Sequence, residues 1–321
     1  MRGLPLAAAI FRRVGSTIVM LAMVLVIIFV TLRIIPGDPL EAMLGGTESL
    51  TQEAQVEFRK EYGLDKSIPV QFVDWLTKAA HGDLSRSLRT GQPVADALVE
   101  SFEPTLVLGL LSFGLVIGIG VALGIVAGLT RSSWLDRAIQ LLLNLGLAVP
   151  NITLAIGMIL VFGVWLQWVP VLGYVSPTED LLGSIQSLVL PALALSSHFV
   201  GEAGRQTRAA VREASTQPHI RTGRAKGLKP GLLIFRYILR TASPPIVAIL
   251  GLQFGRLFAG TVIIESMFLI PGLGRLLVEA ILFRDFPVIQ GGVLLIALLV
   301  VTGNFLADLL ATALDPRQRH A

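Results

Sequence analysis

The chain has 321 residues, of which 53% are hydrophobic, 15% are charged and none is cysteine. Soluble domains usually carry about 25% charged residues, so this composition excludes a soluble globular domain, a disordered chain and a disulfide framework. It also excludes thiolate catalysis and cysteine-based metal sites. We therefore expect an all-α protein that crosses a membrane several times. The isoelectric point of about 9.8 is attributed to basic cytoplasmic loops, and no nucleic-acid partner is expected.

Six membrane spans are expected, because a span needs about 20 mainly apolar residues and charges mark the breaks between spans. The N-terminal span is interpreted as an uncleaved anchor, since no small-residue cleavage pattern follows it. The expected spans are residues 14–32, 105–130, a helix from 138 that leaves the bilayer near 165–170, 188–201 with about a turn on each side, a helix from after Pro244–Pro245 to near Ile264, and 288–310.

Lys and Arg gather in the N-terminal tail, the loops 131–137 and 202–243, and the C-terminal tail. By the positive-inside rule, both termini are expected to be cytoplasmic. The resulting organisation is a tail and first span (1–35), an extracytoplasmic region (36–104), and a membrane core with the other spans and the cytoplasmic loop (105–321).

The extracytoplasmic region is expected to be structured rather than a linker. It holds amphipathic stretches at 52–62 and 70–79, with Pro69 as a plausible helix start. Two interpretations stay open, a solvated cap without a specific role or a docking site for an external partner.

The cytoplasmic segment from Arg205 to Arg240 is too long and too basic for a simple connector. Breaks are expected at Pro218, Gly227 and 229–231, with Gly227 suited to a helix C-cap. A lipid-headgroup patch would also be basic. However, a short helix with small residues between basic ones is better suited to a groove on another protein.

This segment, Arg221-Thr222-Gly223-Arg224-Ala225-Lys226-Gly227-Leu228, resembles the EAA loop (usually R-T-A-R-A-K-G-L) of the permease subunits of ABC importers for dipeptides, oligopeptides and nickel. It departs from the family at Gly223, usually Ala, and at Gln217-Pro218-His219, usually Gln-Asp-Tyr. Further matches cover almost the whole chain: Pro36-Gly37-Asp38-Pro39, Trp75-Leu76, Gly82-Asp83-Leu84, Pro104-Thr105-Leu106, Gly251-Leu252-Gln253-Phe254-Gly255, Glu265, Pro271-Gly272-Leu273-Gly274, Asp285-Phe286-Pro287, Gln290-Gly291, Asn304, Asp308 and Asp315-Pro316-Arg317.

The resemblance implies a type I ABC importer permease fold in the bacterial inner membrane, with a structured extracytoplasmic loop between helices 1 and 2. It implies a heterodimer with a second homologous permease, in which each subunit forms half of the translocation pathway. Two cytoplasmic ABC ATPases and an extracytoplasmic solute-binding protein complete the transporter. Dipeptides or oligopeptides are the expected cargo; nickel or a small solute such as glutathione is the alternative, and a secondary transporter is less favoured.

By the same resemblance, a coupling helix from about 214 to 228 would contact an ATPase. The expected ATPase-coupling residues are Ala214, Ile220, Arg221, Thr222, Gly223, Arg224, Ala225, Lys226, Gly227 and Leu228.

The sequence shows no arrangement of residues typical of a catalytic or metal-binding site. The sequence has no G-x-x-x-x-G-K-[ST] motif, so ATP and Mg are expected on the partner ATPases and no cofactor on this subunit. The four histidines have no metal-ligand spacing, and no nucleophile–base pair is evident. The chain is therefore not expected to be an enzyme, and an intramembrane enzyme is the least favoured alternative.

Ionisable groups within spans are functional candidates. Arg256 either lines an aqueous pathway or contacts the partner permease, or else pairs structurally with an acid or a carbonyl. Glu265 is expected at the outer interface, where it would cap the following loop, and Asp308 is interpreted as an interface residue. The pathway or partner-permease candidates are Gly251, Gln253, Gly255, Arg256 and Glu265.

Small residues four apart let helix backbones approach closely. Gly120, Gly124 and Gly128 have this spacing, as do Gly114 and Gly118 before them. They could pack within the subunit or against its partner.

Overall fold

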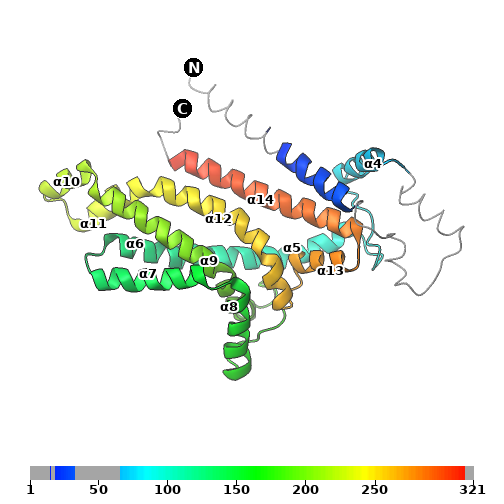
Figure 1. The fold of residues 1–321 in the computed structure, drawn as a ribbon, viewed down its shortest axis with the longest axis horizontal. Helices are drawn as coiled ribbons and strands as arrows, with labels where there is room; N and C mark the ends of the chain where they lie inside the picture. Colours follow the sequence, from blue (N-terminus) through cyan, green and yellow to red (C-terminus); the bar gives the residue numbers. More distant parts are fainter. Residues whose placement is uncertain (1–14, 16–18, 33–65, 315–321) are drawn as a thin grey trace, which may run out of the picture. The chain divides into compact units, whose positions relative to one another are not determined.

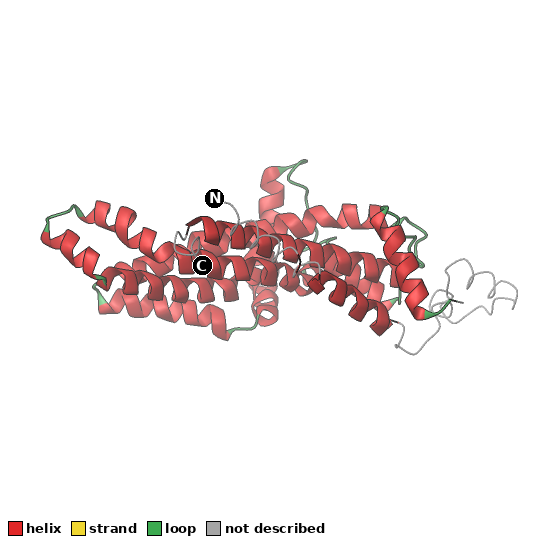
Figure 2. Cartoon of the chain, turned by 90° about the horizontal axis from the view of Figure 1, so that it is seen from above, coloured by secondary structure: helices red, strands yellow, loops and turns green. Residues whose placement is uncertain are grey.

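The computed structural model describes residues 15, 19–32 and 66–314, with side chains as far as residue 305. The described residues form helices and loops without a β-sheet (Figures 1 and 2). An isolated antiparallel bridge joins Arg86 to Pro93. The expectation of an all-α fold is therefore confirmed. The amphipathic stretch 52–62 and the motif Pro36–Pro39 lie outside the described residues.

The described helices are α4 (Ile68–Ala80), α5 (Val94–Leu115), α6 (Ala122–Leu129), α7 (Ser133–Ala148), α8 (Asn151–Met158), α9 (Leu181–Thr216), α10 (Pro218–Ala225), α11 (Pro230–Leu232), α12 (Leu239–Met267), α13 (Leu273–Leu282) and α14 (Phe286–Leu314), with π-helical segments η1 (Val116–Val121), η2 (Ile159–Trp165) and η3 (Leu233–Ile238). A further apolar helix spans Val19–Leu32. As Pro69 suggested, α4 begins with a proline in its first turn, where the missing N–H would be unpaired in any case.

Among the described residues, four continuous helices are long and apolar enough to cross a membrane, namely Val94–Leu129, Leu181–Thr216, Pro230–Met267 and Phe286–Phe305. A fifth span is possible if α7 and the α8–η2 helix count together, although they are bent by 99°. The helix Val19–Leu32 is shorter. Six spans in total therefore stays a prediction.

Several expected boundaries were wrong. The third span is not one straight helix, because the chain bends at Val149–Pro150 between α7 and α8. The helix containing α5 begins at Val94 rather than 105 and holds Pro104 inside it. The fourth span is much longer than expected. Much of the expected loop 202–243 consequently belongs to the ends of long helices.

The fifth span was expected to start after Pro244–Pro245, yet α12 runs through both prolines. A proline in a helix removes the N–H that would reach the carbonyl four residues earlier. For Pro244 that carbonyl belongs to Arg240, and the Ser243 hydroxyl donates to it at 3.0 Å. Nearby hydroxyls can replace a lost backbone donor in this way within membrane helices.

The chain divides into two compact units, residues 1–103 with 271–298 and residues 104–270 with 299–321. The expected division at 35 and 104 stays a prediction. In the first unit, buried apolar side chains of α5, α13 and α14 form a core with Leu32. Phe29 also packs edge-on against Phe72 of α4, with ring centroids 5.3 Å apart.

In the second unit α9 is the central helix, packed against η1, α6, α7, α8 and α12 (Figure 1). Glycines of η1 and α6 allow this packing. A Cβ on Gly120 would lie 2.9 Å from the carbonyl oxygen of Val200, and one on Gly124 would lie 2.5 Å from that of Gly204. Gly120, Gly124 and Gly128 therefore pack within the subunit, which the sequence left undecided.

Candidate functional site

The candidate coupling helix, α10, follows α9 after a single residue. Gln217 ends α9 and begins α10 in an extended conformation (φ −64°, ψ 148°). Pro218, the first residue of α10, imposes this conformation, because a proline disfavours the helical region for the residue before it. Helix α10 thus spans Pro218–Ala225, shorter than the expected 214–228, and Ala214 belongs to α9.

A glycine cap closes α10. Gly227 has φ +73°, its N–H donates to the Arg224 carbonyl at 3.0 Å, and the Leu228 N–H donates to the Gly223 carbonyl at 3.2 Å. These two bonds make a Schellman motif, in which a glycine adopts the left-handed conformation just after the helix. The prediction that Gly227 ends a helix is therefore confirmed.

One face of α10 is buried in the subunit. Ile220 is fully buried in an apolar cluster with Val211 and Ala214 of α9 and Leu233 and Ile238 of η3. Gly223 lies on the same face, three residues on, where a Cβ would sit 2.9 Å from Leu233 Cδ1 and 3.2 Å from Leu228 Cδ1. Both atoms are the ends of leucine side chains, so position 223 is tight but can accept a small residue such as the alanine usual in the family.

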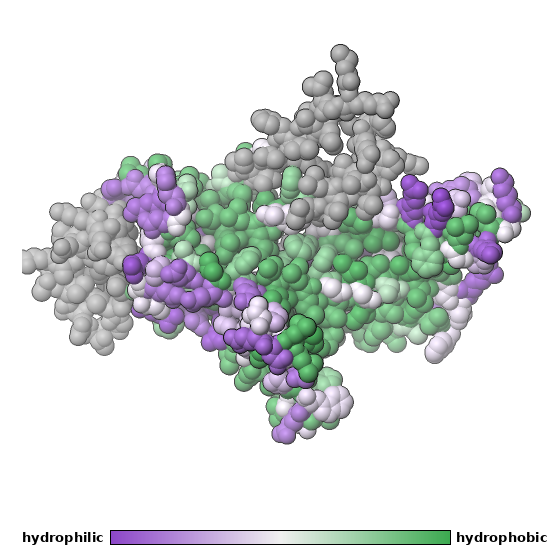
Figure 3. All heavy atoms as spheres, turned by 180° about the vertical axis from the view of Figure 1, so that it is seen from behind, coloured by the Kyte–Doolittle hydropathy of each residue, from purple (hydrophilic) through white to green (hydrophobic). Residues whose placement is uncertain are grey.

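The opposite face of α10 is exposed and basic. Arg221, Arg224 and Lys226 are exposed, as are Thr222 and Ala225 between them. In Figure 3, hydrophilic residues gather at the end of the second unit where α10 lies, beside helices covered by hydrophobic residues. The structure thus separates the predicted coupling residues into an inner apolar face and an outer basic face.

The C-terminal part of α9 is held to α7 by an ion pair that the sequence did not indicate. Arg208 donates to both carboxylate oxygens of Asp136, through Nε at 2.7 Å and Nη2 at 2.6 Å. Arg212 approaches the same carboxylate at 3.6 Å. Two parallel bonds from one guanidinium are stronger and more directional than a single contact. They fix the stretch of α9 that leads into α10.

Inside the spans, two of the pathway candidates meet at Glu202 of α9. Arg256 Nη1 lies 3.2 and 3.3 Å from the two oxygens of Glu202. The buried Gln253 donates to Glu202 Oε2 at 3.2 Å and to the Phe199 carbonyl at 3.4 Å. The alternative in which Arg256 pairs with an acid is therefore what the structure shows. Its side chain nevertheless stays 55% exposed.

The other candidates do not join this cluster. Glu265 lies two residues before the end of α12 at Met267, is fully buried within the subunit, and its carboxylate accepts a 2.8 Å hydrogen bond from Thr105 Oγ1; its expected position at the outer interface stays a prediction. Gly251 is buried in α12, and a Cβ on Gly255 would lie 2.9 Å from Asn304 Oδ1 of α14. The Asp308 side chain lies outside the described residues.

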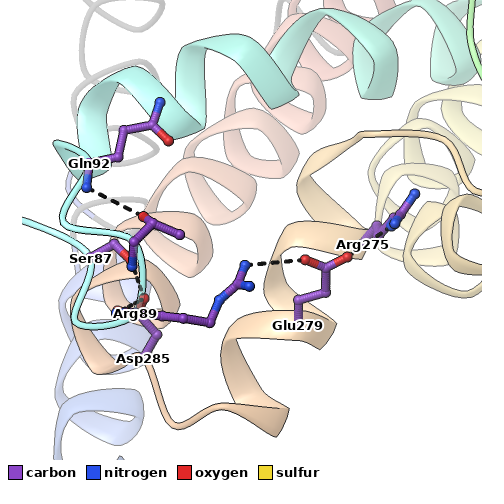
Figure 4. Close-up of polar contacts among 7 residues, drawn as sticks. Ser87, Arg89, Gln92, Arg275, Glu279 and Asp285 are labelled. Atoms are coloured by element: carbon purple, nitrogen blue, oxygen red, sulfur yellow. Dashed lines mark hydrogen bonds and ion pairs between the residues drawn. The ribbon is translucent and has the colours of Figure 1, made fainter. Parts of the chain in front are cut away.

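A second polar cluster lies in the first unit. The sequence indicated its central residue, Asp285, only as part of the motif Asp285-Phe286-Pro287. The buried Asp285 accepts hydrogen bonds from Ser87 Oγ at 2.5 Å and from the Leu88 N–H at 3.1 Å. Arg89 and Arg275 both reach Glu279, at 3.5 and 3.0 Å (Figure 4). These contacts hold the loop before α5 to α13 and to the start of α14. No sequence signal pairs segments almost 200 residues apart.

The part of the chain with described side chains holds no group of three or more His, Asp or Glu side chains that could bind a metal ion. Glu202 is instead paired with an arginine, and Asp285 accepts hydrogen bonds from a hydroxyl and a backbone N–H. The described residues therefore form a helical scaffold with an exposed basic helix, α10, and ion pairs that join α9 to α7 and to α12.

Comparison with known proteins gives consistent matches. Residues 120–320 match the family described as "Binding-protein-dependent transport system inner membrane component", and residues 6–109 match the corresponding N-terminal family. A protein of Brucella abortus (strain 2308) named "Putative peptide transport system permease protein" is 39% identical over 98% of this chain and 100% of its own length. The di/tripeptide transport system permease protein DppB of Pseudomonas aeruginosa (strain UCBPP-PA14) is 34% identical over 97% of this chain and 98% of its own.

Solved structures support the fold. A crystal structure described as the MetNI methionine ABC transporter in inward-facing conformations matches with a TM-score of 0.56, at 20% identity, over 68% of this chain and 96% of that chain. The expected permease fold is thus confirmed at the level of its architecture.

Proposed function

The chain belongs to the family of binding-protein-dependent transport system inner membrane components, and on this basis we propose that it is one permease subunit of an ATP-driven importer of dipeptides or oligopeptides. Relatives aligned over nearly the whole chain bear names of peptide and di/tripeptide permeases, which supports peptide cargo over nickel or glutathione. In this proposal a second, homologous permease forms the other half of the pathway. An extracytoplasmic binding protein delivers the peptide.

The coupling element is α10. Two cytoplasmic ATPases carry ATP and Mg, and the groove of one of them receives the exposed basic face of α10. Both termini and α10 are cytoplasmic in this arrangement, as the distribution of Lys and Arg indicates. The residues toward the ATPase are Arg221, Thr222, Arg224, Ala225 and Lys226, while Ile220 and Gly223 hold α10 to the subunit.

The observation that carries this proposal is the construction of α10. It is exposed and basic on one face, and on the other it packs against α9 and η3. Because one residue joins it to α9, a displacement of α10 must move α9. Helix α9 contacts η1, α6, α7, α8 and α12, so the movement reaches the rest of the second unit. Rigid-body shifts of packed helices are a common way to switch a pathway.

Substitutions at Gly227 test the coupling role. Gly227 has φ +73° and open space around it, so Gly227→Val is strained by its backbone alone. Strain of about 1–3 kcal/mol is expected, which corresponds to about a 5–150-fold effect on an equilibrium. We expect Gly227→Val to lose ATP-driven uptake of Ala-Ala in vesicles that contain the complete transporter, while its amount in the membrane is unchanged.

Two control variants separate strain from bulk. Gly227→Asn should retain most uptake, because asparagine tolerates the left-handed conformation. Gly231→Val should also retain it, because Gly231 has the same open surroundings without a positive φ. Normal uptake by Gly227→Val would count against coupling through α10. Uptake of Ala-Ala by the unmodified transporter without ATP would refute the proposed function itself.

A further inference from the structure

From Pro245 onward, the exposed residues of α12 form one continuous stripe. Pro245, Ala248, Leu252, Arg256, Ala259 and Ile263 are exposed. Their spacing of three or four residues places them on a single face of the helix, and Arg256 is the one charged residue among them. The stripe lies within a helix long and apolar enough to cross a membrane.

Lipid is a poor neighbour for this stripe. Arg256 lies about three turns before the end of α12 at Met267, well inside a hydrocarbon layer about 30 Å thick. An arginine at such depth is costly to insert into lipid, and such residues face water or protein instead. Arg256 is 55% exposed although it is paired with Glu202, so its exposed side is expected to face water.

The pair leaves binding capacity unused. Both contacts to Glu202 use Nη1 of Arg256. Among the described residues, none accepts a hydrogen bond from Nε or Nη2. The guanidinium lies over the Phe199 ring, 5.8 Å from its centroid, which restricts its orientation. A planar guanidinium with two free donors is suited to a carboxylate.

Glu202 supplies the opposite charge beside it. Gln253, itself fully buried, holds one oxygen of the carboxylate at 3.2 Å. The Glu202 side chain remains 25% exposed. The cluster therefore presents one cationic and one anionic group, side by side, to the same exposed region. Without a ligand the two groups neutralise each other.

We propose that Glu202, Gln253 and Arg256 form a peptide-terminus site in the translocation pathway. Arg256 binds the terminal carboxylate of a passing unblocked peptide, and Glu202 binds its terminal ammonium. In a dipeptide the two groups lie no more than roughly 7 Å apart, so it can meet both residues whatever its side chains, and a longer peptide meets one residue at a time. Binding is weak because the ligand competes with the internal ion pair, which suits a site that must also release its cargo. This inference rests on the proposed peptide import.

A cysteine reporter tests the site directly, because the chain has no cysteine of its own. Ala259 lies on the exposed stripe, three residues after Arg256, so Ala259→Cys leaves the cluster intact. We expect Cys at this position, in the complete transporter in vesicles, to react with membrane-impermeant thiol reagents. Leu141→Cys is the control, since Leu141 is 63% exposed on an apolar face of α7 and is expected to meet lipid.

Peptide protection is the second measurement. During ATP turnover with the binding protein, Ala-Ala should slow labelling of Ala259→Cys at least about threefold. N-acetyl-Ala-Ala-amide, which carries neither charge, should leave it unchanged. Adding Arg256→Gln or Glu202→Gln should remove the protection by Ala-Ala. A purely structural ion pair would not make protection depend on the charges of the peptide.

Charge preference is the third measurement. Two unit charges 4 Å apart in water interact by about 1 kcal/mol, which is a factor of about five in rate. The double variant Ala259→Cys with Arg256→Gln should therefore react faster with a cationic reagent, because the negative charge of Glu202 remains. The double variant Ala259→Cys with Glu202→Gln should react faster with an anionic reagent, because the positive charge of Arg256 remains. An unreactive Ala259→Cys, or equal protection by both peptides, would overturn the proposed site. ATP-driven uptake of Ala-Ala by the unmodified transporter would leave the proposed function standing in either case.

Discussion

Replacing Gly124 by alanine should loosen the packing of α6 on α9. A Cβ at this position would lie 2.5 Å from the Gly204 carbonyl oxygen and 2.6 Å from Thr207 Cβ. Ordinary contacts begin about 1 Å further out, and one of these atoms belongs to the backbone of α9. The added methyl therefore cannot be accommodated by rotating a side chain, and the two helices must separate.

The magnitude follows from two opposing terms. Overpacking a close contact typically costs about 1–3 kcal/mol, whereas glycine to alanine within a helix gains up to about 1 kcal/mol. Gly114→Ala measures the second term alone, because nothing lies within 4 Å of its added Cβ. We expect Gly124→Ala to be about 1–3 kcal/mol less stable than Gly114→Ala.

The assay is reversible unfolding of the purified subunit in mixed micelles. The fraction of a denaturing detergent in the micelles is increased, and the loss of helix is measured by circular dichroism. Both variants are compared with the unmodified chain in the same micelles. Equal stabilities for Gly124→Ala and Gly114→Ala would refute the reasoning, because they would show that α6 and α9 do not approach as closely as the structure has them.

Two further ion-pair and hydrogen-bond predictions use the same unfolding measurement. Arg208→Ala should destabilise the subunit by about 1–2 kcal/mol, because it breaks the two hydrogen bonds to the mostly buried Asp136. Arg212 lies 3.6 Å from the same carboxylate, so Arg212→Ala should cost less than about 0.5 kcal/mol. Equal losses of stability in the two variants would contradict this ranking. Ser87→Ala should lower the free energy of unfolding by about 1–2 kcal/mol, because it removes a hydrogen-bond donor from the buried Asp285. Amide hydrogen exchange in residues 85–93 should accelerate in this variant. Unchanged exchange would argue against the hydrogen bond.

Local chemistry made part of this fold predictable. Pro218 and Gly227 bound a short helix because proline favours the first turn and glycine the position after the last, and both effects depend on neighbouring residues alone. The lengths of the apolar segments likewise indicated where most of the membrane spans lie. The bend at Pro150 had a visible signal in its proline, but an unbroken apolar run concealed it.

Contacts between distant segments were not predictable. Glu265 was expected to cap the loop that follows it, and nothing in the sequence indicates that Thr105, 160 residues earlier, donates to its carboxylate at 2.8 Å. Likewise Arg256 and Glu202 are more than 50 residues apart. Their pairing depends on how α9 and α12 pack, which is decided by glycine contacts and side-chain volumes along the whole interface.

The single residue between α9 and α10 limits how this subunit can bend. Gln217 has only two soft dihedral angles, and Pro218 confines it to extended backbone. The junction is therefore a stiff bend between two helices rather than a flexible linker, and it has no additional residues that could extend when α10 moves. In the proposed coupling, a displacement of the basic face of α10 is therefore passed on to α9.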